Sequence, residues 1–471
     1  MKIVRVFLLG AFLLSGFFVQ AKTTVHVHFP GSEGHKALLW TYEDLVSYKE
    51  IIAGQTQADA NGDFTFTLYN KDIIPVKVQV EFFKIEFYVE ANTDYRVDID
   101  SVDMKNREFY PVNIVGFLAP EFKIVKPAVN ELNAELAGAN EIFADFYDSN
   151  YVFLYQSRLP ASTLNAFLQK VKDYRNSVHS DFVRKHIDIQ LVQLKMMLRK
   201  TGRKQVVNEF FTAGKILYHD KIYMDFFNSF WSNYLLVSLR GLRYGVLDSV
   251  INNTRSYYAL TRLIETDPLL KDSVVRELVV LRNMIEMYNN RRFSKKAIRY
   301  ILSDISANGL TPENKKIAVD IRKMLIRNYG DKAPDFSLPG FQGGKYSLRD
   351  FQGKYLYLSV WNEKCKECLA QMDYEKELFL DFDDVINFVS VYVGPDTAAA
   401  RKVIEKRDYG WTQLYYNEDF MFLKNYRVEL FPYYILIDKN GKIEWFKAKM
   451  PGEGFSEYFI EMLNEKKGNL K

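Results

Sequence analysis

Two cysteines, Cys365 and Cys368, are the residues whose type and spacing most clearly suggest chemistry in this chain. They are the only cysteines among 471 residues. They follow shortly after the apolar run 355–361, which has the composition of a buried strand. A C-x-x-C pair between a strand and a helix can open and close as a disulfide. The sequence therefore predicts a redox-active dithiol.

The two sulfurs are expected to have different roles. At a helix start, the free backbone N–H groups and the helix dipole favour a thiolate at Cys365, which makes it the expected nucleophile. Cys368 follows one helical turn later, so it can close the disulfide and resolve a mixed disulfide with a substrate. By this logic only Cys365 needs to be exposed. The positive charges of Lys364 and Lys366 favour the Cys365 thiolate, whereas the negative charges of Glu363 and Glu367 oppose it. The direction of their net effect therefore stays open.

A zinc site and an inert structural disulfide are the two alternative uses of such a pair. Zinc usually takes four ligands, and residues 330–471 contain no further cysteine and no histidine. Secreted proteins stabilised by disulfides usually have more cysteines than this chain. His26 and His28 share one strand face, but without a third ligand they are better interpreted as two surface histidines. We therefore expect a working dithiol, no metal ligands and no cofactor.

The first 21 residues predict a secretory signal peptide. Lys2 and Arg5 give a basic start, residues 6–19 are apolar, and Ala21 offers a small residue at a cleavage site. An uncleaved anchor is the weaker alternative, because a bilayer-spanning helix needs ~20 apolar residues. We expect cleavage after Ala21 and export to the periplasm, where thiols can be oxidised.

The periodicity of the mature chain divides it into three regions. Residues 22–120 contain short alternating runs between turn signals, which predict a small β-sandwich. Residues 121–329 have helical spacing and predict an α-helical domain of seven or eight helices, with the aromatic run 226–231 in its core. Residues 330–471 alternate between strand and helix patterns and predict an α/β domain. The net charge of +4 and the lack of a basic run with interleaved aromatic residues give no support for a nucleic-acid partner.

Three stretches of the C-terminal region match a known family. They are Ala333-Pro-Asp-Phe336, Trp361 four residues before Cys365, and the segment 427–443 that contains Pro432. With these motifs, residues 330–450 resemble the thioredoxin-like fold, in particular the exported thiol–disulfide oxidoreductases of the TlpA/ResA type. Residues 22–329 resemble, more weakly, the accessory regions of Bacteroidetes-type exported proteins of this kind.

The resemblance implies a role for several residues around the dithiol. In the family a cis-proline faces the cysteines, and Pro432 matches it. The backbone of Phe431 would then dock a substrate peptide beside Cys365 as an added strand. The remaining residues expected to contact substrate lie around the C-x-x-C motif: Trp361, Lys364, Lys366 and Glu367.

The chain departs from the family at positions that tune the dithiol. Lys364 replaces a tryptophan that usually precedes the first cysteine, and the inner dipeptide is Lys-Glu where the family often has x-Pro. The two usual positions of a buried acid hold Ser359 and Gln371. Proton transfer to Cys368 would then depend on water or on Glu367.

Three functions remain compatible with these residues. The leading hypothesis is a cell-envelope oxidoreductase that reduces or isomerises protein disulfides, with a membrane thiol relay as its implied electron donor. A thiol peroxidase is weaker, because Asn362 stands three residues before Cys365 where a threonine or serine is wanted. A non-enzymatic binding or scaffold protein with a thioredoxin-like docking module is the third, since fold does not fix function.

Overall fold

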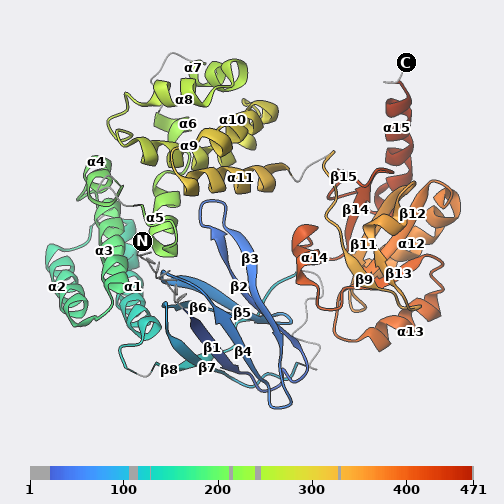
Figure 1. Cartoon of the computed structure of the whole chain (residues 1–471), viewed down its shortest axis with the longest axis horizontal. Helices are drawn as coiled ribbons and strands as arrows, with labels where there is room; N and C mark the ends of the chain where they lie inside the picture. The colour runs from blue at the N-terminus through green and yellow to red at the C-terminus, as the bar shows by residue number, and fades with distance from the viewer. Residues whose placement is uncertain are drawn as a thin grey trace, which may run out of the picture.

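The computed structural model describes residues 22–104, 115–127, 129–156, 158–211, 216–238, 245–326 and 330–468. The predicted signal peptide lies outside the described residues. Within them, no helix has both the length and the apolar character needed to cross a membrane. Figure 1 shows a strand-rich N-terminal region, a central helical region and a C-terminal α/β domain.

The N-terminal region consists of two four-stranded sheets, in the orders β4-β1-β7-β8 and β3-β2-β5-β6. One buried apolar cluster takes side chains from both sheets, such as Val25 of β1 and Val78 of β5. The last strand, β8, lies beyond residue 120, so this region extends past the predicted boundary. The strands are β1 Thr23–His28, β2 Lys36–Asp44, β3 Lys49–Gln57, β4 Asp63–Leu68, β5 Ile74–Val80, β6 Phe83–Val89, β7 Asp94–Ile99 and β8 Phe122–Lys126.

The helical region has two separate buried clusters where the sequence predicted one domain. One belongs to α1–α3 and the other mainly to α4–α11, but α3 also contributes Ile189 and Val192 to the second cluster. Figure 1 shows α4 and α5 next to α3. The aromatic run Phe226–Trp231 lies in the second cluster, as predicted. The helices are α1 Leu132–Tyr155, α2 Ala161–Ser177, α3 Asp181–Met197, α4 Arg203–Val206, α5 Lys221–Phe230, α6 Tyr234–Ser238, α7 Val246–Ser249, α8 Tyr257–Ile264, α9 Ser273–Tyr288, α10 Lys295–Asn308 and α11 Pro312–Ile326.

The C-terminal domain is built on a five-stranded sheet of order β13-β12-β11-β14-β15. The central strand β11 pairs in parallel with β12 and antiparallel with β14, and all seven of its residues are buried. A strand buried on both faces explains its continuous apolar sequence. The elements are β9 Ser337–Pro339, β10 Lys345–Ser347, β11 Tyr355–Trp361, α12 Lys366–Phe382, β12 Ile386–Tyr392, α13 Thr397–Arg407, β13 Thr412–Tyr415, α14 Phe420–Asn425, β14 Tyr433–Ile437, β15 Ile443–Trp445 and α15 Phe455–Gly468.

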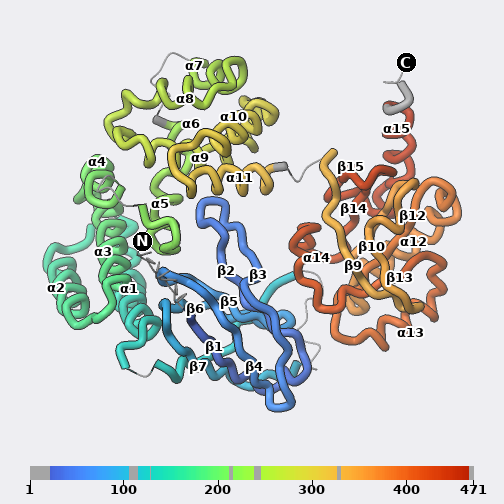
Figure 2. The backbone as a smooth tube through the Cα atoms, in the orientation of Figure 1, coloured from blue at the N-terminus to red at the C-terminus, as the bar shows by residue number. Residues whose placement is uncertain are grey.

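The β region contacts the C-terminal domain near α14, which lies on the side facing the β sheets (Figures 1 and 2). Glu50 of β3 accepts hydrogen bonds from Lys77 at 2.6 Å and from Lys424 of α14 at 2.7 Å. Burial acts to raise the pKa of Glu50, but the bonds from Lys424 and Lys77 outweigh it and lower the pKa to about 2. Glu50 is therefore an ionised link between the two domains.

We expect Glu50→Gln to weaken this contact. The folded-state pKa lies below the unfolded value, so the stabilisation is complete above about pH 4.5 and is lost as the pH falls towards 2. Urea unfolding at pH 7 should show a loss of up to about 3 kcal/mol, which nearly disappears near pH 2. Glu86→Gln is the matched control, because Glu86 lies 3.7 Å from Lys77 but is 40% exposed. A loss for Glu50→Gln no larger than that of the control, at pH 7, contradicts the expectation.

Candidate active site

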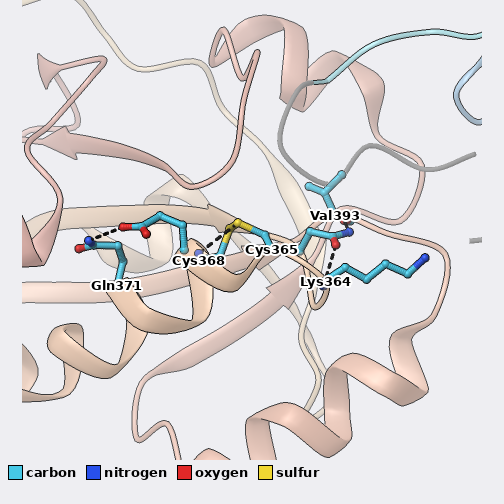
Figure 3. The surroundings of a disulfide bond; sticks show 7 residues. Lys364, Cys365, Cys368, Gln371 and Val393 are labelled. Carbon is cyan, nitrogen blue, oxygen red and sulfur yellow. Dashed lines mark hydrogen bonds between the residues drawn. A yellow bond between two sulfur atoms is a disulfide. The ribbon is translucent and has the colours of Figure 1, made fainter. Parts of the chain in front are cut away.

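The loop between β11 and α12 holds the C-x-x-C motif in place. Asn362 is buried, and its Nδ2 donates to the carbonyl of Val393 at 2.7 Å. Its Oδ1 accepts the backbone N–H of Lys364 at 2.9 Å. The first bond ties the loop to the end of β12 and the second fixes the backbone within the loop; Figure 3 shows both beside the cysteines. The first cysteine is thus positioned by a rigid strand end.

Cys365 and Cys368 are joined in a disulfide, and Cys365 is the N-cap residue of α12. The Sγ of Cys365 accepts the backbone N–H of Cys368 at 3.1 Å. This donor is one of the N–H groups that a helix start leaves free, and it stabilises negative charge on the sulfur. A backbone N–H of the helix start therefore points at the sulfur of Cys365, and the nucleophilic role of Cys365 stays a prediction.

The exposure of Cys365 differs from the expectation. Both cysteines are 0% exposed and belong to the apolar cluster of the C-terminal domain. The expectation that Cys365 presents its sulfur to solvent is therefore wrong for this oxidised form. Cys365 is buried because apolar side chains of the C-terminal domain pack around the disulfide.

The charged residues of the motif have different positions. The side chain of Lys364 extends away from the disulfide in Figure 3, so its charge is not directed at the sulfur. Lys366 and Glu367 are exposed on the first turn of α12. Glu367 accepts a hydrogen bond from Gln371 at 2.8 Å, and Gln371 also accepts the N–H of Gly452 at 2.8 Å. Gln371 therefore links α12 to the segment before α15.

Two of the residues expected to bind substrate have buried side chains. Trp361 is 1% exposed and packs against Tyr392 with ring centroids 5.3 Å apart. Its ring supports the loop from inside, so a substrate cannot touch it in this form. Phe431 is also buried, and its peptide bond to Pro432 is cis, as the family resemblance implies. Glu429, just before them, accepts the N–H of Val115 from the N-terminal region at 2.8 Å.

A buried acid, Glu375, was missed by the sequence reasoning. It lies on α12 seven residues after Cys368, which is about two turns and hence the same helix face. Its side chain is 0% exposed, and Tyr434 lies within hydrogen-bonding reach of Oε2 at 3.3 Å. Its Oε1 has no hydrogen-bond partner among the described residues. The helical phase of Cys368, Met372 and Leu378, all buried, was the signal that could have revealed it.

The environment of Glu375 favours its neutral form. Burial raises the pKa of this carboxyl well above its usual range, and the hydroxyls of Tyr434 and Ser359 offset only part of that effect. Ser359 occupies one of the positions where the family has an acid, and it pairs with Tyr434 across β11 and β14. A buried acid thus lies on α12 beside the strand position that Ser359 occupies.

The N-terminal histidines that share a strand face do not converge. His26 lies 3.1 Å from Asp94, whereas His28 lies 2.8 Å from Asp63. Each histidine pairs with its own carboxylate.

Known proteins match the C-terminal domain of this chain. The AhpC/TSA family matches residues 329–446. The thiol–disulfide oxidoreductase ResA of Geobacillus thermodenitrificans is 32% identical over 116 residues, which cover 24% of this chain and 66% of that relative, just under two thirds. Thioredoxin-like protein YneN of Bacillus subtilis is 30% identical over 122 residues, which cover 24% of this chain and 68% of the relative.

The chain belongs to the thioredoxin-like proteins, and relatives of its C-terminal domain are named thiol–disulfide oxidoreductases. A solved structure of a putative thiol–disulfide oxidoreductase from Bacteroides vulgatus aligns at 31% identity over 29% of this chain and 92% of that one, with a TM-score of 0.27. These matches cover about a quarter to a third of the chain, so the family assignment concerns the C-terminal domain.

Proposed function

We propose that this protein is an exported, periplasmic oxidoreductase that reduces or isomerises protein disulfides through Cys365 and Cys368. The observation that carries the proposal is the disulfide at the N-terminus of α12, directly after the central strand of a thioredoxin-like sheet. Export would follow cleavage of the predicted signal peptide after Ala21. The two N-terminal sheets, packed as a small sandwich, and the helical region would act as accessory domains that select the partner.

The chemistry is a two-step thiol–disulfide exchange. In the reduced protein, the Cys365 thiolate attacks one sulfur of a substrate disulfide, forms a mixed disulfide and releases the other substrate sulfur as a thiolate. Cys368 loses its proton and attacks Cys365, which releases the second substrate thiolate and leaves the protein oxidised. Two electrons pass to the substrate. A dithiol donor, such as a membrane thiol relay, must then return two electrons to the Cys365–Cys368 disulfide.

Glu375 is proposed to exchange a proton with Cys368 during this reaction. Its carboxyl is held neutral by burial and lies on the same face of α12 as Cys368. A neutral carboxyl can donate a proton but cannot accept one. Because about two turns separate them, Glu375 would give its proton through water to the Cys368 sulfur when the dithiol donor reopens the disulfide. The carboxylate left behind would take the proton of Cys368 back when that thiol resolves the mixed disulfide. Glu375 is therefore a positioning and proton-storing residue, which takes the role that Ser359 and Gln371 cannot fill.

Burial of the disulfide places a condition on substrate access. Because both sulfurs are 0% exposed, exchange requires the loop that carries Cys365 to open or its apolar neighbours to move. The substrate-docking edge at Phe431 and Pro432 would then receive an extended peptide as an added strand. The exposed Lys366 and Glu367 would contact that peptide at its rim.

Turnover of a protein disulfide tests the proposal. The purified chain without its signal peptide, supplied with a dithiol donor, is expected to accelerate reduction of a model disulfide-bonded protein well above the donor alone. A non-enzymatic docking module is the second candidate, and the burial of Cys365 is the observation that favours it. Equal rates with and without the protein would contradict the enzyme and support the docking module. Rapid thiol-dependent consumption of peroxide would instead indicate a peroxidase.

A further inference from the structure

A histidine and two glutamates converge where the N-terminal region meets the C-terminal domain. His35 precedes β2, Glu81 lies between β5 and β6, and Glu418 precedes α14. The Nδ1 of His35 lies 3.4 Å from Oε1 of Glu81 and 3.3 Å from Oε1 of Glu418. The ligand atoms of the three residues all lie within 4.8 Å of one another. His35 and Glu418, which are 383 positions apart in sequence, thus lie in direct contact.

We propose that His35, Glu81 and Glu418 bind a divalent cation of the zinc class. One imidazole nitrogen and two carboxylate oxygens form a ligand set that Zn²⁺ uses, with bonds of about 2.0–2.2 Å. Two ligands at such bond lengths in a tetrahedral arrangement are separated by about 3.3–3.5 Å. The separations of 3.3 and 3.4 Å at His35 match that spacing. This inference does not depend on the proposed redox function.

Groups outside the three ligands orient the carboxylates. The hydroxyl of Tyr416 donates to Oε2 of Glu81 at 2.5 Å. The backbone N–H of Lys36 donates to Oε2 of Glu418 at 3.0 Å. In both glutamates the outer oxygen is therefore held by a donor, and Oε1 is left to face His35. Outer hydrogen bonds that fix ligand orientation in this way are typical of metal centres.

Burial and access also fit a bound cation. Glu81 is only 4% exposed, and burying a carboxylate is costly unless a positive charge accompanies it. The three residues line a cavity of about 490 Å³, together with Asp396 and Thr397 among others. The cavity gives an ion a route of entry and leaves room for water as a fourth ligand.

Without a cation, the same residues form an ion pair between the two domains. Hydrogen bonds to Glu418 and Glu81 raise the pKa of His35 to about 10, so a proton on Nδ1 occupies the place of the cation. Burial and the charge of Glu418 raise the pKa of Glu81, so the metal-free state pairs one imidazolium with one carboxylate and a neutral Glu81. A divalent cation with neutral imidazole would instead balance both carboxylates. The two states differ in whether the protein takes up metal.

Zinc titration of the oxidised protein tests the proposal. The disulfide removes Cys365 and Cys368 as ligands, so the chain without its signal peptide is treated with chelator, dialysed and titrated with Zn²⁺ by calorimetry. We expect one equivalent to bind and the melting temperature to rise with Zn²⁺ concentration. His35→Ala and Glu418→Gln should each lower the affinity more than 100-fold, and Tyr416→Phe by about 10–100-fold. His179→Ala is the matched control, because His179 also pairs with a glutamate, at 3.0 Å from Glu135, and should bind zinc normally.

Two results would overturn the inference. One is that the oxidised wild-type chain binds no Zn²⁺, which leaves only the ion pair. The other is binding that His35→Ala and Glu418→Gln leave unchanged. Near-ultraviolet circular dichroism checks that each variant is folded. If either variant fails to fold, the wild-type titration and the zinc affinity of Tyr416→Phe still decide whether this site binds zinc.

Discussion

Serine in place of Cys365 is expected to reduce the turnover of a protein disulfide to the rate of the dithiol donor alone. The substitution removes the sulfur that is the N-cap of α12 and accepts the N–H of Cys368, and the hydroxyl of serine is no nucleophile at neutral pH. Cys368 is left as a thiol inside the first turn of α12, without the N-cap position that favours a thiolate at Cys365, so it cannot replace the lost nucleophile. The measurement is the initial rate of reduction under donor concentrations that saturate the wild type.

Cys368→Ser is the matched variant for this prediction. It keeps the nucleophile and removes the resolving thiol, so it should accumulate a mixed disulfide with the substrate that is visible on a non-reducing gel. Cys365→Ser should form none. Undiminished turnover by Cys365→Ser, or a mixed disulfide carried by Cys368 in that variant, would contradict the assigned roles.

Glu375→Gln is expected to lower the rate by about 10²-fold, the lower end of the range for general acid–base catalysis. The amide keeps the shape and hydrogen-bonding capacity of the side chain but cannot exchange a proton. The loss should appear in the pH–rate profile, where the limb that reports Glu375 disappears. Single-turnover formation of the mixed disulfide by Cys365 should change less than its resolution by Cys368.

The stability of the same variant separates the proton role from a structural one. Burial raises the folded-state pKa of Glu375, so the wild type is most stable below the unfolded-state pKa of about 4.5 and loses stability as the pH rises from there to the folded-state pKa. Glu375→Gln should lack this loss, and it should equal or exceed the wild type in urea unfolding above that pH range. Glu377→Gln is the control, because Glu377 lies on the same helix but is exposed. A Glu375→Gln variant with wild-type rate and pH profile would remove Glu375 from the mechanism.

The chemistry of the site could be read from sequence because its signal is local. Cys365 and Cys368 are three positions apart, and the strand before them and the helix after them are both evident from apolar spacing. The position of Pro432 depended on the family resemblance, since nothing near it in sequence marks it as facing a cysteine. The fold class was accessible in the same way, from runs such as that of β4, whose residues alternate between exposed and buried.

Features that depend on tertiary packing could not be read in this way. The burial of Cys365 results from packing around the loop, which no local pattern reports. The two clusters of the helical region were missed because each helix has an apolar face whichever neighbour it packs against. Similarly, His35 and Glu418 are brought together only by the contact between domains.

An equilibrium redox titration of Cys365 and Cys368 tests the central claim most directly. The chain without its signal peptide is equilibrated in buffers of graded dithiol and disulfide, and its free thiols are trapped by alkylation and counted by mass. The account predicts that both thiols appear together in one reversible two-electron transition, with the same midpoint from the oxidised and from the reduced side. A pair that stays oxidised under strong dithiol in the folded protein, or that cannot reoxidise once reduced, would contradict the claim that this disulfide is a working redox centre.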